Sequence, residues 1–99
     1  YKVIKNGITI SNVTCANTQG ASMQPALFNK NIICYKPFNP DELRQGQIII
    51  YKDDSNQSIS HRIKALLNDG VIVQGDNNKP HEEVLYSRIE GIVALIILA

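Results

Sequence analysis

The β-branched runs of this chain are short and are separated by turn-forming residues, which limits the fold more than any other feature. The clearest run is residues 47–52 (QIIIYK), and residues 32–35 (IICY) and 71–74 (VIVQ) are similar. Almost no stretch spaces its apolar residues as an amphipathic helix does. We therefore expect one mostly-β domain over residues 1–99, built as a barrel or in a sandwich-like way.

Turn-forming residues divide the rest of the chain. Asn6-Gly7 and Asn68-Asp69-Gly70 are typical of tight hairpin turns. Pro40 and the two acidic residues after it predict one short helical turn at most, which Gly46 ends. The remaining segments are expected to be polar turns at 12–24 and 53–58, a strand at 60–67, a polar loop at 75–83, a strand or short turn at 84–89, and a last strand after Gly91.

The most apolar run is residues 92–99 (IVALIILA). It is far shorter than the roughly 20 residues that a membrane-spanning helix needs, so we expect a buried strand. The alternative is a membrane segment that is cut short because the chain is a fragment. Residues 1–10 are interrupted by Lys2, Lys5 and Asn6, and they contain neither a signal-peptide core nor a spanning helix.

Composition excludes several classes of function. Ten basic and nine acidic residues leave a net charge of +1, which gives no footprint for nucleic acid. Six aromatic residues without tryptophan do not form a stacking platform for bases. Two cysteines, Cys15 and Cys34, do not make a disulfide-rich scaffold, and whether they pair depends on the fold, which leaves the redox compartment open.

One serine has neighbours suited to acyl transfer. Ser22 stands in the segment Gly20-Ala21-Ser22-Met23-Gln24-Pro25. Small residues such as Gly20 and Ala21 let backbone N–H groups approach a substrate carbonyl closely, as an oxyanion hole requires. Pro25 stiffens the exit from this turn.

A serine nucleophile needs a base, which is usually held by a third group. His61 stands at the start of an expected strand, and Asp76 follows one hairpin later. A hairpin that turns at residues 68–70 brings its two ends together, so Asp76 can lie near His61. Imidazole titrates near 6.5 without help, so His61 can act as a base at neutral pH.

Several ordered boxes of residues extend this pattern. They are Ser22-Met23-Gln24-Pro25, residues 43–52 (LRQGQIIIYK), His61-Arg62-Ile63, Gly75-Asp76-Asn77-Asn78, and Ile89-Glu90-Gly91-Ile92-Val93. In this order the chain resembles signal peptidase I over residues 20–94. The branch that it resembles most is found in the endoplasmic reticulum, archaea and some Gram-positive bacteria.

The resemblance implies a mostly-β barrel or folded-sheet domain, a fold shared with the SOS-repressor peptidases. It implies a serine endopeptidase that cuts exported or secreted precursors after small residues at the first and third positions before the cut. It makes Ser22 the nucleophile, His61 the general base where other branches keep a lysine, and Asp76 the group that orients the histidine or stabilises its charged form. Glu82 stands at the family's second acidic position. Gly20, Ala21 and Met23 are implied in the oxyanion hole and substrate pocket, with no metal and no cofactor.

The chain departs from the family pattern in three places. Gly20 stands where the family commonly has a hydroxyl residue, so a second oxyanion donor must come from elsewhere. Gly46-Gln47 replaces a usual Gly-Asp, and Asn29-Lys30-Asn31 replaces another acidic position. The anchor expected before the serine is absent, because residues 1–19 are too polar to span a membrane. We expect a catalytic domain on the extracytoplasmic side, associated with the membrane through a missing anchor or a partner.

Two other functions stay open. The first is a self-cleaving peptidase of the repressor type, but residues 1–22 contain no Ala-Gly or Cys-Gly bond of the kind that those proteins cut. The second is a non-catalytic interaction module on the same scaffold. The presence of Ser22, His61 and Asp76 argues against the module. Surface serines and histidines add little stability, so a non-catalytic domain has no physical reason to keep all three.

Overall fold

The computed structural model describes residues 13–17, 31–77 and 80–97. Their strands form one antiparallel sheet in the order β1-β2-β7-β3-β4-β5-β6. The strands are β1 (Thr14–Asn17), β2 (Ile32–Lys36), β3 (Ile48–Lys52), β4 (Ser58–Leu66), β5 (Gly70–Gln74), β6 (His81–Leu85) and β7 (Ile89–Ile97). The mostly-β prediction is confirmed. The sheet is not closed into a barrel, because β1 and β6 are its two edges.

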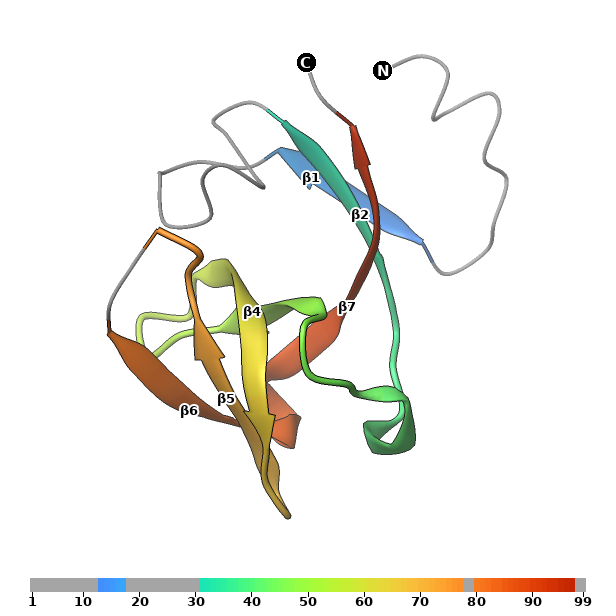
Figure 1. Ribbon diagram of the computed structural model, residues 1–99. Helices are drawn as coiled ribbons and strands as arrows, with labels where there is room; N and C mark the ends of the chain where they lie inside the picture. Colours follow the sequence, from blue (N-terminus) through green and yellow to red (C-terminus); the bar gives the residue numbers. More distant parts are fainter. Residues whose placement is uncertain (1–12, 18–30, 78–79, 98–99) are drawn as a thin grey trace.

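Strands β3 to β6 follow one another as hairpins, whereas β7 returns to lie between β2 and β3. In Figure 1, β4, β5 and β6 gather at one end of the molecule, and β1, β2 and the last part of β7 lie at the other. The apolar C-terminal run is a strand, as expected, over its described part, and it is central in the sheet. It is less buried than expected, because Ile92 is buried but Val93, Leu95 and Ile96 are half-buried and Ala94 is exposed. No helix among the described ranges is long and apolar enough to cross a membrane.

Two strands lie in stretches that were predicted to be turns or loops. The polar strand β1 forms because it pairs with β2, where Cys15 faces Cys34 and the two are joined by a disulfide. Strand β6 begins inside the predicted 75–83 loop, and Val84 alone of its side chains is fully buried. Neither strand has the apolar alternation that makes a strand visible in a sequence. The predicted hairpin turn at Asn6-Gly7 lies outside the described residues.

The described ranges contain two single 3-10 turns, whereas the sequence predicted one short helical turn at most. The expected turn, Pro40–Glu42, is closed by the Asn39 N–H, which donates to the Glu42 side chain at 3.1 Å. The second, Tyr86–Arg88, is held from outside, because the Tyr86 N–H and hydroxyl donate to the carbonyls of Asp69 and Leu67. These long-range bonds leave no local signal in the sequence.

Both faces of β3 are buried, and this arrangement separates two clusters of apolar side chains. Ile49 and Tyr51 point to one face, which we call the inner face, while Ile48 and Ile50 point to the outer face. The main core lies on the inner face and consists of Leu43, Ile49, Tyr51, Ile63, Val71, Val73, Val84, Ile89 and Ile92. Any polar side chain on this face therefore lies beside an apolar core.

Gly91 allows β2 and β7 to lie close together. A Cβ atom at this position would collide with the carbonyl oxygen of Lys36 and come within 2.9 Å of the Tyr35 ring. The crowding comes largely from backbone, so it cannot be relieved by rotating a side chain.

We expect Gly91→Ala to lower the free energy of unfolding by about 1–3 kcal/mol, the usual cost of overpacking a core. Urea denaturation measures the loss. Ala94→Ser is the control, because it also adds one heavy atom to β7 but at an exposed position. Equal stability of the two variants would contradict the close approach at Gly91.

Candidate functional site

His61 lies on the inner face of the sheet, next to the main core. It belongs to β4 and pairs with Ile49 of β3. Because side chains alternate along a strand, His61 shares its face with Ile59 and Ile63. The imidazole is half-buried.

Tyr51 joins His61 to a carboxylate on a distant strand. Its hydroxyl oxygen lies 3.0 Å from Nδ1 of His61, and its hydroxyl donates a hydrogen bond to Oε1 of Glu82. The two rings are 5.9 Å apart between centroids and tilted by 55°. Three strands, β3, β4 and β6, thus supply one connected chain of polar groups, His61–Tyr51–Glu82.

Burial sets the protonation of the first two groups. It lowers the pKa of His61, an effect that the negative charges of Glu82 and Asp76 oppose. It raises the pKa of Tyr51 far above its usual value, and the hydrogen bond to Glu82 acts in the same direction. At neutral pH the imidazole is therefore uncharged and the phenol keeps its proton.

Asp76 is held by an arginine. Nε and Nη2 of Arg62 donate to its two oxygens at 2.8 and 2.7 Å, and Nη1 donates to the Gly46 carbonyl at 2.8 Å. These bonds from Arg62 lower the pKa of the Asp76 carboxyl. The side chain of Arg62 is thus held by two partners, Asp76 and the Gly46 carbonyl.

The predicted β4–β5 hairpin explains this contact. Arg62 on β4 pairs with Gln74 on β5, and Asp76 lies two residues beyond Gln74, within reach of the Arg62 side chain. The hairpin brings residue 76 to the start of β4 as expected. The negative charge of Asp76 is close enough to raise the pKa of His61. The two oxygens of Asp76 accept hydrogen bonds from Arg62, the next residue along β4.

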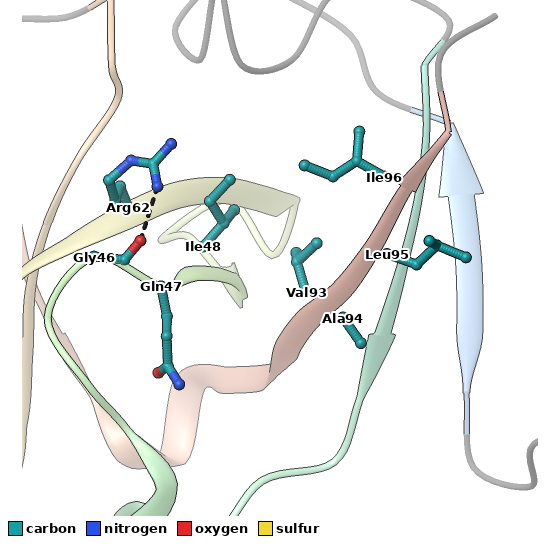
Figure 2. A pocket seen from close by; sticks show the side chains of 8 residues that line it. All are labelled: Gly46, Gln47, Ile48, Arg62, Val93, Ala94, Leu95 and Ile96. Carbon is teal, nitrogen blue, oxygen red and sulfur yellow. Dashed lines mark hydrogen bonds between the residues drawn. The ribbon is translucent and has the colours of Figure 1, made fainter.

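A groove of about 380 Å³ lies on the outer face of the sheet, between residues 46–48 at the start of β3, Arg62 of β4 and residues 93–96 of β7. Figure 2 shows Arg62 at one side of it and the apolar side chains of Ile48, Val93 and Ile96 pointing into it. His61 points to the opposite face, because neighbouring residues of a strand alternate. The groove is therefore separate from the His61–Tyr51–Glu82 chain.

The predicted site is only partly within the described residues. Ser22, Gly20, Ala21 and Met23 lie outside them. Of the others, Glu82 connects to His61 through Tyr51, a residue that the sequence did not single out. Tyr51 stands two places beyond the partner of His61, which makes it a diagonal neighbour on the same face. Only the register of the hairpin reveals that relation.

We expect Asp76→Asn to lower the free energy of unfolding at pH 7 by about 1–2 kcal/mol, because it removes a charge-assisted fork. The pKa of Asp76 is lower in the folded state than in the unfolded state, where it is about 3.9. The stability that Asp76 contributes is therefore fully present above about pH 3.9, and it is lost as the pH falls through the lower pKa of the folded state. Denaturation of both proteins from about pH 7 to about pH 3 measures this difference, which should shrink toward the acid end. Asp54→Asn is the control, because this carboxylate is fully exposed and its ion pair with Arg88 is longer, at 3.5 Å. A difference that stays constant with pH would contradict the ion pair.

Within residues 13–17, 31–77 and 80–97, no group of three or more His, Cys, Asp or Glu side chains could hold a metal ion. The polar groups that this part of the chain brings together on the inner face are the neutral imidazole of His61, the phenol of Tyr51 and the carboxylate of Glu82. Comparison with known proteins gives no family model, no curated protein and no solved structure that matches the chain.

Proposed function

We propose that this domain is a serine endopeptidase of the signal peptidase I kind, in which Ser22 is the nucleophile and His61 the general base. The observation that supports it most is the setting of His61. A half-buried imidazole, uncharged at neutral pH and oriented by a hydrogen bond at Nδ1, is what a general base needs.

The proposed reaction is acyl transfer in two halves. His61 takes the proton of the Ser22 hydroxyl as Oγ attacks the substrate carbonyl, and the proton then passes to the leaving amine as the peptide bond breaks. In the second half, His61 takes a proton from water as the water oxygen attacks the acyl ester, and it then gives this proton to Oγ of Ser22 as the ester bond breaks and the carboxylic acid leaves. The charge on the imidazolium in both halves is stabilised by the carboxylates of Glu82 and Asp76, which favour the protonated ring.

The substrate assignment rests on the resemblance to signal peptidase I. It implies a polypeptide with small residues at the first and third positions before the cut, with Gly20, Ala21 and Met23 near the reacting carbonyl. It also implies a membrane-associated catalytic domain on the extracytoplasmic side. The Cys15–Cys34 disulfide supports that location, because structural disulfides persist in oxidising compartments and are rare in the cytosol.

We expect Ser22→Ala to abolish labelling by a serine-directed acylating probe, and His61→Ala to lower cleavage by about 10²–10⁴-fold. The substrate is a peptide with alanine at the first and third positions before the cut, compared with one that has phenylalanine there. Ser87→Ala and His81→Ala are matched controls at exposed positions and should keep full activity.

Undiminished cleavage by His61→Ala would rule out the base assignment. A folded wild-type domain that neither labels nor cleaves would favour the non-catalytic interaction module. Cleavage of its own chain without cleavage of the peptide would favour the self-processing alternative.

The activity should rise with pH through the pKa of His61, because only the neutral imidazole accepts the serine proton. Burial lowers this pKa, so the midpoint of the rise should lie below about 6.5, the value for an unperturbed histidine. The profile of kcat/KM from about pH 4 to about pH 8 measures it. Glu82→Ala should move the midpoint to lower pH, since the carboxylate favours the charged ring. A flat profile over this range would contradict a histidine base.

A further inference from the structure

The two nitrogens of a neutral imidazole have different roles, because one carries the proton and the other the lone pair. A histidine base works only if the lone pair is on the nitrogen that faces the nucleophile. The hydrogen bond at the other nitrogen decides which form is present. In His61, Nδ1 lies 3.0 Å from the Tyr51 hydroxyl oxygen.

The direction of that bond follows from the number of protons. Tyr51 has one hydroxyl proton, and a carboxylate such as Glu82 can only accept. The Tyr51 proton therefore goes to Glu82, and its oxygen turns lone pairs toward His61. A bond between Tyr51 and Nδ1 then exists only if Nδ1 is the donor.

We propose that Tyr51 is a positioning residue that holds His61 as the Nδ1–H tautomer, with Glu82 fixing the direction of the hydrogen bonds. The lone pair is thereby placed on Nε2. The catalytic role of this tautomer rests on the proposed function, in which Nε2 is the atom that takes the proton of Ser22. The tautomer itself does not depend on the reaction.

Packing makes Tyr51 suited to this role. Its side chain has 0% exposure and belongs to the main core, so the position of the ring is fixed. Its raised pKa keeps the hydroxyl proton in place over the range in which His61 titrates. Tyr51 reaches from β3 to Glu82 on β6, although β4 and β5 lie between these strands in the sheet.

This arrangement gives the two acidic residues different roles. Both oxygens of Asp76 accept from Arg62, and the negative charge of this carboxylate favours the protonated form of His61. Glu82 acts on the histidine through its charge and also through Tyr51. The orienting role that the sequence assigned to Asp76 belongs, in this proposal, to Tyr51 and Glu82.

The direct test is ¹⁵N NMR of the imidazole nitrogens at a pH above the titration of His61. The chain has only two histidines, so His81→Gln identifies the signals of His61. Wild-type protein should show a protonated Nδ1 and an unprotonated Nε2. The reverse pattern overturns the proposal without any variant at Tyr51.

Two variants test the cause. Tyr51→Phe keeps the buried ring and removes the acceptor, so the population of the Nδ1–H form should fall. Glu82→Ala removes the acceptor of the Tyr51 proton at an exposed strand position, so the hydroxyl can turn and donate to Nδ1, with the same result. Tyr86→Phe and Glu83→Ala are the controls, and both should leave the spectrum of His61 unchanged. If Tyr51→Phe and Glu82→Ala also leave it unchanged, the proposal is wrong.

Activity separates this proposal from the proposed function. Tyr51→Phe should lower kcat/KM by about 10- to 100-fold, a part of what general-base catalysis contributes. If Ser22→Ala abolishes activity while Tyr51→Phe keeps both full activity and the Nδ1–H form, the positioning role fails alone. If Ser22→Ala is fully active but the tautomer shifts in Tyr51→Phe, the peptidase assignment fails and the hydrogen-bond direction stands.

Discussion

The contact of Tyr51 with Glu82 requires a strongly curved sheet. The two residues belong to β3 and β6, which are separated by two strands in the sheet order. They meet because the sheet curves so that the inner faces of these strands approach each other across an apolar core, in which Ile63, Val73 and Val84 are fully buried. The apolar packing that stabilises the fold therefore also sets the distance between the phenol and the carboxylate.

Alternation along β4 divides the chemistry of this region between two faces. His61 points inward to Tyr51, and Arg62 points outward to Asp76 and to the Gly46 carbonyl. Adjacent residues in one strand thus belong to two separate networks. The two bonds from Arg62 join Asp76, just beyond the end of β5, to the middle of β4, and they hold the Asp76 charge close to the histidine.

The parts of the fold that depend on local sequence could be predicted, and the parts that depend on distant pairing could not. Strands β2, β3, β5 and β7 carry dense β-branched residues, and each lies where it was predicted. Strands β1 and β6 are polar, and they form because their backbones pair with β2 and β5. In the same way, the nearness of His61 and Asp76 followed from one hairpin, whereas Tyr51 could be found only from register and curvature. Ser22 and its neighbours lie outside the described residues, so their place beside His61 stays a prediction.

The disulfide between β1 and β2 also changes the connectivity of the chain. Cys15 and Cys34 are 19 residues apart, and Ser22 lies between them in the sequence. The covalent bond therefore makes a ring that contains the proposed nucleophile. A single break of the backbone anywhere inside this ring leaves both new ends attached to the domain, and Ser22 stays covalently joined to the sheet that carries His61. Only a second break or reduction of the disulfide would separate the two residues.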